Sequence, residues 1–196
     1  MGAEQPSPRK PSSPGNRSIV PGQLVLAGFC GWLDAVSFLA LGGIFSETMT
    51  GNLLFAAISL GSGQPPEQVY AFLIPLSAFS VGAVVGGAVL YRWRELIEPR
   101  RAFMVVFTLV VAATIMTLVL GADGENAAAR LVVGVLALGM GLQNAILLVV
   151  GRANIATNVM TQTLARALSS LPLVGGDNAD WQFRFGSIGC FVVGAI

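Results

Sequence analysis

The sequence contains no histidine and only two cysteines, Cys30 and Cys190. The absence of histidine excludes Ser-His-Asp and Cys-His catalysis, and it excludes zinc or haem sites that histidine would hold. Two isolated cysteines in apolar runs make neither a disulfide framework nor a metal cluster. We therefore expect a protein that is not an enzyme and that carries no cofactor and no metal.

Charged residues are also scarce. They make up 11% of the 196 residues, whereas hydrophobic residues make up 54% and the mean hydropathy is +0.74. A soluble domain of this length would carry about twice this charged fraction. The formal net charge of +1 gives no basic excess, so we expect no nucleic-acid partner. The composition predicts an all-α, polytopic membrane protein whose main partner is the lipid bilayer.

Apolar runs divide the chain into long and short segments. Residues 1–23 are rich in Pro, Ser and Gly and predict a disordered basic tail, followed by one membrane domain over residues 24–196. Helices that can cross a hydrocarbon core of ~30 Å, at ~1.5 Å per residue, are expected near residues 24–45, 69–91, 102–120 and 127–150, and from residue 181 onward. The segments near residues 50–61 and 157–168 reach only ~18 Å. We predict about five to six crossings plus these short broken or re-entrant segments.

The chain contains an internal repeat, with residues 24–121 as the first unit and residues 127–196 as the second. Three matches keep their order and a nearly constant offset: residues 31–35 with 141–145, 49–50 with 160–161, and 79–83 with 191–195. Such spacing favours a common origin of the two units. The second unit lacks a counterpart of the segment that ends near Leu120. We expect it to be truncated, either because the chain is naturally short or because it is a fragment.

Basic residues mark the cytoplasmic side of a membrane protein. If both short segments crossed, the basic tail and the loop with Arg92 and Arg101 would fall on opposite sides. If both segments are re-entrant, these clusters lie inside together with Arg152 and Arg166, and the acidic loop near Asp123 lies outside. The second arrangement fits the rule and places the N-terminus in the cytoplasm. It also puts three crossings between the first helices of the two units, which inverts one unit relative to the other.

Asp34 is the clearest candidate for a functional residue, because it lies mid-way along the first crossing segment, far from any other charge. An ionised carboxylate there costs at least ~2.5–3.5 kcal/mol. One interpretation is a proton carrier, a cation ligand or a substrate contact. The other is a packing hydrogen bond to Gln143 or to the repeat-related Asn144. An aspartyl protease would need a second intramembrane aspartate, which the sequence lacks.

Polar runs open both short segments. If these segments are half-helices that start inside the membrane, their N-termini offer unpaired N–H groups and a positive dipole end, which suit an anion or a polar solute. The alternative is an ordinary loop with Ser, Thr or Asn caps. Amide side chains in the fifth segment either line the same site or make interhelical hydrogen bonds. The candidate substrate-binding residues are Asp34, Glu47, Thr48, Thr50, Asn52, Gln143, Asn144, Thr157, Asn158 and Thr161.

Two ordered motifs resemble a known family. The runs GWLDAVSF (31–38), LGGIF (41–45) and MTGN (49–52) resemble the opening signature of the YoaK-like bacterial membrane proteins, which are defined by the domain of unknown function 1275. GLQNA (141–145) and MTQTL (160–164) resemble its second signature. The resemblance implies a multi-pass protein of the bacterial inner membrane with about six helices. It implies no activity, substrate or catalytic residue.

Two functions therefore remain open. One is a transporter or channel-like protein for a small solute or ion, with Asp34 and the polar runs at its centre. The other is a non-transporting scaffold that interacts with lipid or with partner proteins. A water-filled cavity that Asp34 shares with Thr50, Asn52 and Asn144 would favour transport, whereas a dry contact with one amide would favour the scaffold. A second copy of the chain is a candidate partner, since the incomplete second unit leaves a face to cover.

Overall fold

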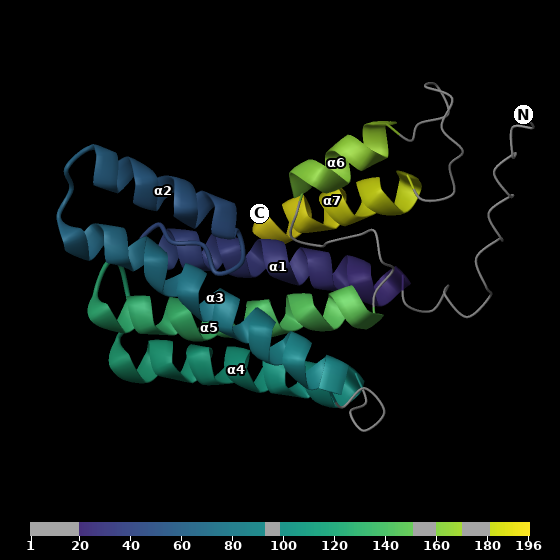
Figure 1. The fold of residues 1–196 in the computed structure, drawn as a ribbon, viewed down its shortest axis with the longest axis horizontal. Coiled ribbons are helices and arrows are strands. Elements are labelled where there is room, and N and C mark those ends of the chain that lie inside the picture. The colour runs from purple at the N-terminus through teal and green to yellow at the C-terminus, as the bar shows by residue number, and fades with distance from the viewer. Residues whose placement is uncertain (1–19, 93–98, 151–159, 170–180) are drawn as a thin grey trace, which may run out of the picture.

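The structure is a computed structural model that describes residues 20–92, 99–150, 160–169 and 181–196. Within these residues the chain forms helices and no strand (Figure 1). The helices are α1 (Val20–Ala40), α2 (Met49–Gly61), α3 (Pro66–Arg92), α4 (Pro99–Leu120), α5 (Ala127–Val150), α6 (Met160–Ser169) and α7 (Trp181–Ala195). The predicted all-α class is confirmed. Residues 1–19 of the expected tail, and the candidate residues Thr157 and Asn158, lie outside the described residues.

Four of the described helices are long and apolar enough to cross a membrane. Their spans are Pro21–Ala40, Pro66–Val89, Phe103–Leu120 and Ala127–Leu148. The sequence predicts five to six crossings. α7 is not among the four spans because its 15 residues reach only ~22 Å. The chain is therefore a polytopic helical membrane protein.

The outer surfaces of the long helices are apolar. Leu39 of α1, Leu118 of α4 and Leu148 of α5 are each at least three-quarters exposed. α5 is the most buried of the four spans and α4 the least. Leucine side chains on the outside of a bundle require hydrocarbon around them, so the surface is the one that a lipid bilayer covers.

α1 begins and ends earlier than the sequence predicts. Its first residue is Val20, so residues 20–23, which the composition assigns to the tail, are helical. Its last residue is Ala40, because Gly42 and Gly43 adopt φ angles of +85° and +72°, in the left-handed region that favours glycine. The backbone N–H of Gly124 donates to the carbonyl of Ala40 at 2.9 Å and so satisfies one of the last carbonyls of the helix. Beyond this point the chain folds back as the loop of residues 41–48.

The two short helices stay within one half of the bundle each. In Figure 1, α2 starts near the middle of the long axis and runs toward the end where α3 begins, whereas α6 starts near the middle and runs toward the opposite end, where α7 begins. They have 13 and 10 residues. Neither helix runs from end to end, which agrees with the predicted re-entrant segments.

An aromatic series holds α2 against its neighbours. The ring of Phe38 in α1 stacks on that of Phe45 in the loop, with centroids 4.8 Å apart, and Phe45 stacks on Phe55 of α2 at 6.4 Å. Phe55 then meets Phe72 of α3 at 5.5 Å. Offset aromatic pairs at such distances are favourable. The series therefore ties the loop and α2 to the long helices on both sides.

Helices of the two units pack against each other in a reciprocal way. α3 packs on α5 and α1 packs on α7, whereas α2 packs on α3 and α6 on α7 within their own units. Figure 1 shows α1 and α5 running in opposite directions, and likewise α3 and α7. The helices of the two predicted units are thus intertwined, and α5 and α7 run opposite to α1 and α3, as an inverted repeat requires.

Glycines mark equivalent contacts in the two long pairs. A Cβ atom on Gly31 would overlap the carbonyl oxygen of Phe191, and a Cβ atom on Gly141 would overlap that of Phe79. Gly31 aligns with Gly141, and Phe79 aligns with Phe191, in the predicted repeat. Both pairs therefore approach at positions where only glycine leaves room for the facing backbone.

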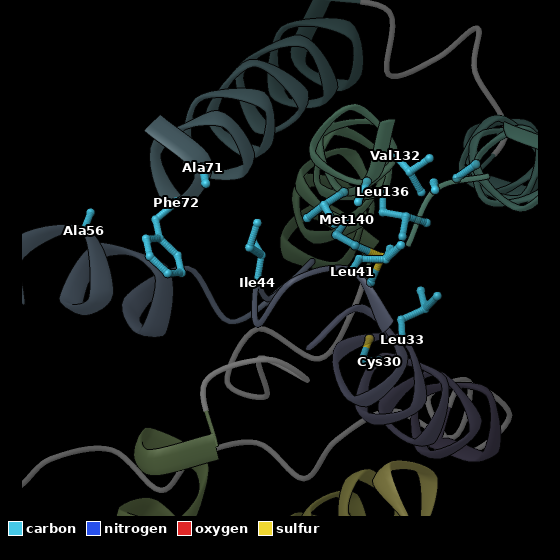
Figure 2. Packing of buried hydrophobic residues seen from close by; sticks show 14 residues of the cluster. Cys30, Leu33, Leu41, Ile44, Ala56, Ala71, Phe72, Val132, Leu136 and Met140 are labelled. Atoms are coloured by element: carbon cyan, nitrogen blue, oxygen red, sulfur yellow. The ribbon is translucent and has the colours of Figure 1, made fainter. Parts of the chain in front are cut away.

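The apolar core lies between α1, the 41–48 loop, α3 and α5. Figure 2 shows Cys30 and Leu33 of α1 near Leu41, with Leu136 and Met140 of α5 beside them. The loop thus contributes to the interior of the bundle, although loops normally run over a protein surface. Its polar residues must then find partners inside the protein, since lipid offers none.

Candidate functional site

Asp34 is buried in the last third of α1, with 4% of its surface exposed. Its carboxylate accepts hydrogen bonds from the Ser46 hydroxyl at 3.1 Å, the Glu47 N–H at 2.7 Å and the Thr48 N–H at 3.1 Å, and from the Thr48 hydroxyl. Thr48 is the N-cap residue of α2. Asp34 therefore satisfies backbone N–H groups at the start of the half-length helix, which otherwise have no partner.

These hydrogen bonds bear on both interpretations of Asp34, as a functional carboxylate and as a packing contact with the amides of α5. Its carboxylate bonds not to the amides of α5 but to residues of the loop that follows its own helix. The start of α2 does attract an anion, as the helix dipole predicts, but that anion is the carboxylate of Asp34 itself. Asp34 thus anchors the start of α2.

Asn52 fixes the same loop from the other side. It is fully buried, its Oδ1 accepts the N–H of Phe45 at 3.0 Å, and its Nδ2 donates to the carbonyl of Phe45 at 2.8 Å. The same Nδ2 also approaches the sulfur of Met49 at 3.8 Å. All hydrogen-bonding groups of the side chain are used inside the loop, so Asn52 positions the backbone around Glu47.

Glu47 is the buried acid that lacks a full set of partners. Its side chain is 2% exposed. Oε1 lies 3.5 Å from Nδ2 of Asn144, and Oε2 is buried with no hydrogen-bond partner. A buried carboxyl oxygen without a partner is costly, and such groups are usually paired or protonated.

The surroundings of Glu47 favour its neutral form. Glu47 lies in the loop after α1, outside the four candidate spans. Burial, and to a lesser extent the nearby charge of Asp34, raises the pKa of Glu47 to about 8, against hydrogen bonds from Cys30 and Asn144 that lower it. A carboxyl group with a pKa near neutrality can bind and release a proton at physiological pH. The cluster is therefore able to exchange a proton at Glu47.

Two amide side chains of α5 contact the residues around Glu47. Gln143 is buried, and its Nε2 lies 3.3 Å from the sulfur of Cys30. Asn144 donates to the carbonyl of Met140 at 3.0 Å and reaches Glu47 with the same nitrogen. The contact between Asn144 and Glu47 joins the second unit to the first, so the cluster lies at the interface of the two units.

The structure brings six of the ten candidate residues into one cluster: Asp34, Glu47, Thr48, Asn52, Gln143 and Asn144. Thr50 and Thr161 are exposed at the first turns of α2 and α6, and so lie apart from the buried cluster.

Two members of the cluster, Cys30 and Ser46, are absent from the sequence prediction. Cys30 precedes Asp34 by about one helical turn, so helical periodicity places both on one face and could have identified it. Ser46 adjoins Glu47, but its contact with Asp34 depends on the fold of the loop.

A groove of about 320 Å³ lies beside the cluster, between α1 and α7. Its lining includes Gly31, Asp34, Phe38, Phe45, Thr48 and Phe191. Most of these side chains are apolar, and the two polar ones already bond each other. The groove is therefore a space bounded by apolar walls next to the cluster rather than a polar binding pocket.

The acidic residues do not form a metal site within the part of the chain that the structure describes. No group of three or more His, Cys, Asp or Glu residues is arranged there to hold a metal ion. Four donors already occupy the oxygens of Asp34. The acid oxygen of the cluster that has no partner is Oε2 of Glu47, and this carboxyl group can bind a proton.

The family model described as "Protein of unknown function (DUF1275)" matches residues 23–196. The chain belongs to the DUF1275 family. The family predicted from the two sequence motifs is confirmed, and the match to DUF1275 includes every residue of the cluster. No curated protein and no solved structure matches the chain. For this DUF1275 protein, a functional assignment therefore has to be argued from the cluster itself.

Proposed function

We propose that this DUF1275 protein transports a small solute or ion across a bacterial plasma membrane, with Glu47 as its proton-carrying group. The observation that supports the proposal is the buried, unpartnered Oε2 of Glu47. A buried carboxyl oxygen without a partner is costly, and buried ionisable groups with perturbed pKa values are concentrated at functional sites. Glu47 replaces Asp34 as the central residue, because the oxygens of Asp34 are occupied by loop donors.

The architecture supports transport by analogy. Many transporters consist of inverted units with short broken helices, and their binding sites lie where the units meet. Here the loop of the first unit contacts α5 of the second through Glu47 and Asn144. Fold alone does not fix function, so the proposal depends on the acid and the architecture adds to it.

The charge distribution supports an orientation in the membrane. Figure 1 places the start of α1, the end of α3, the start of α4 and the end of α6 at one end of the bundle. The basic residues of these helix ends and of the first turn of α7 are Arg92, Arg100, Arg101, Arg166 and Arg184. The turn between α4 and α5, at the other end, carries Asp123 and Glu125. Since basic residues favour the cytoplasmic side, we place the start of α1 in the cytoplasm.

A carrier function does not require bond cleavage, and the proposal gives no residue a catalytic role. The absence of histidine from the whole sequence supports this choice over an enzyme. The anchoring role of Asp34 also suits a scaffold that transports nothing, because a scaffold needs an ordered α2 as well. The two functions differ in whether Glu47 moves protons.

Proton movement in liposomes tests the proposal. The full chain is reconstituted with a pH-sensitive dye inside, a potassium diffusion potential is applied, and proton uptake is followed with a set of small anions, cations and neutral metabolites. We expect at least one solute to stimulate uptake, and Glu47→Gln to reduce it at least tenfold. Glu67→Gln, at an exposed position in the first turn of α3, is the matched control and should behave like the unmodified chain.

Either of two results would reject the proposal of transport with Glu47 as the proton carrier. One is uptake that no solute raises above that of empty liposomes, although the reconstituted protein is folded. The other is solute-stimulated uptake that is equal in Glu47→Gln and in the unmodified chain. The first result would favour the scaffold, and the second would remove Glu47 from the mechanism.

A further inference from the structure

Two polar side chains outside the cluster are buried without any partner. Gln23, in the first turn of α1, is 3% exposed, and neither its amide nitrogen nor its amide oxygen has a hydrogen-bond partner. Ser187 of α7 is 1% exposed, and its hydroxyl also lacks a partner. Buried polar groups in proteins are almost always paired, either with protein atoms or with ordered water. These three atoms therefore need hydrogen-bond partners that the described protein atoms do not supply.

Gln23 and Ser187 lie at the same level of one helix pair. α1 packs on α7, and Figure 1 shows both helices running in the same direction. The side chain of Leu24 reaches within 3.5 Å of the position that a Cβ atom on Gly186 would take. These two residues are the sequence neighbours of Gln23 and Ser187, so the two unpartnered groups lie near a shared contact between the helices.

One face of α1 leads from this level to the acidic cluster. Gln23, Ala27, Cys30 and Asp34 follow each other at spacings of four, three and four residues, which places them on one side of a helix. All four are at most 4% exposed. Cys30 receives a hydrogen bond from Gln143, and it faces Glu47 together with Asp34. The face therefore starts with an unsatisfied amide and ends at Asp34, which binds the backbone of Glu47.

We propose that water bound by Gln23 and Ser187 begins a polar route along the buried Gln23–Asp34 face of α1, through which Glu47 exchanges protons with the side of the membrane where α1 begins. The ligand class is water together with the hydrated proton, which needs donors and acceptors along its path but no fixed charge. The inference rests on the proposed function, because it supplies the access path to Glu47. It assigns a role to Gln23 and Ser187, which lie outside the cluster.

Replacing the amide of Gln23 by an apolar side chain of similar size tests whether the route contains water. In the liposome assay we expect Gln23→Leu to reduce solute-stimulated proton uptake at least tenfold at an unchanged melting temperature, and Gln23→Asn to retain it. A dry interior would give the opposite result, because removing unpaired buried polar atoms then raises the melting temperature and leaves uptake unchanged. That result would overturn the inference.

A silver-ion test covers the case in which Gln23→Leu does not fold. The background is a chain whose two cysteines are replaced by serine, and its solute-stimulated uptake is verified first because Cys30 belongs to the cluster. In this background Ser187→Cys should make uptake sensitive to Ag⁺, since Ag⁺ reaches thiols that water reaches. Gly189→Cys is the matched control: Gly189 is an exposed position of the same helix, and a Cβ atom there meets nothing within 4 Å. If Ag⁺ inhibits uptake by Ser187→Cys no more than uptake by Gly189→Cys, the route is rejected.

The two proposals fail in different ways. Loss of uptake in Glu47→Gln, together with full uptake in Gln23→Leu and no silver effect at Ser187→Cys, would remove the route and keep the proposed function. Full uptake in Glu47→Gln would remove the proposed function itself.

Discussion

The backbone N–H of Glu47 donates to Oδ1 of Asp34 at 2.7 Å, so one buried acid fixes the backbone that carries the other. Asp34 spends both of its oxygens on the loop. Glu47 keeps one oxygen without a partner. The two acids of the cluster therefore have different tasks: Asp34 positions the loop and α2, and Glu47 is free to change its protonation.

Asp34→Asn should destabilise the protein. The amide presents one acceptor and one donor group where the carboxylate offers two acceptors, so buried N–H and O–H groups of Ser46, Glu47 and Thr48 lose partners. At about 1–3 kcal/mol for each unsatisfied buried group, we expect a loss of roughly 3 kcal/mol in the free energy of unfolding. Thermal and denaturant unfolding in detergent measure this loss.

The matched control for Asp34→Asn is Glu67→Gln, which neutralises an exposed acid and should change stability by no more than about 0.5 kcal/mol. Stability of Asp34→Asn equal to that of the unmodified chain would contradict the anchoring role.

Stability should fall as the pH rises across neutrality, because of Glu47. Its pKa in the folded protein is about 8, above the ordinary value of 4.5, so the folded state binds more protons than the unfolded state between these values. The contribution is complete below pH 4.5 and is lost as the pH rises through 8, at up to about 1.4 kcal/mol per pH unit. Melting temperatures from pH 4 to pH 9 provide the measurement.

Glu47→Gln should remove this component of the pH dependence, since glutamine does not titrate. The difference between the two melting curves isolates Glu47 from other titrating groups. A difference that stays constant over the whole range, or that changes in the opposite direction, would show that Glu47 is not buried in its neutral form.

The course of the helices follows from the sequence because apolar run length decides which helices can cross a membrane. The end of α1 does not follow in the same way. Residues 41–45 are apolar enough to continue a helix, and only the left-handed Gly42 and Gly43, with the contact between Ala40 and Gly124, end it. That contact joins segments far apart in the chain.

The candidate site is foreseeable in its members but not in their roles. Asp34 stands out because it is an isolated charge in an apolar helix, and Glu47 because it opens a short segment. Which of the two is satisfied depends on where the loop donors point after the chain folds back. The sequence shows that both acids and all the donors are present. It does not show which acid the donors reach, so the different roles of Asp34 and Glu47 could not be predicted from it.

Gly31→Ala and Gly141→Ala should each destabilise the protein, and to a similar degree. In both variants the new methyl group would overlap the carbonyl oxygen of a facing helix, at Phe191 and Phe79 respectively. Overpacking usually costs about 1–3 kcal/mol, and rigid backbone cannot move aside, so we expect at least about 2 kcal/mol for each variant. Thermal unfolding of the purified variants measures the effect.

Gly87→Ala is the control for these two variants. Gly87 also lies inside a helix, but a Cβ atom there meets nothing within 4 Å. Alanine favours helix over glycine by about 0.5–1 kcal/mol, so this variant should be as stable as the unmodified chain or more so. A destabilised Gly87→Ala beside a neutral Gly31→Ala would show that the α1–α7 approach is not as close as described.

The half-length of α2 makes a last prediction about topology. With 13 residues, α2 starts near the middle of the bundle and returns to the end where α1 stops, so the turns before α3 and before α5 lie at the same end (Figure 1). In a chain without its native cysteines, Gln64→Cys and Glu125→Cys should react with an impermeant maleimide added to intact cells. Arg101→Cys, at the start of α4, should react only after the membrane is opened. If α2 crossed the membrane instead, with the start of α1 still in the cytoplasm, Gln64→Cys and Glu125→Cys would both react only after the membrane is opened and Arg101→Cys would react in intact cells, and the inverted arrangement of the two units would be wrong.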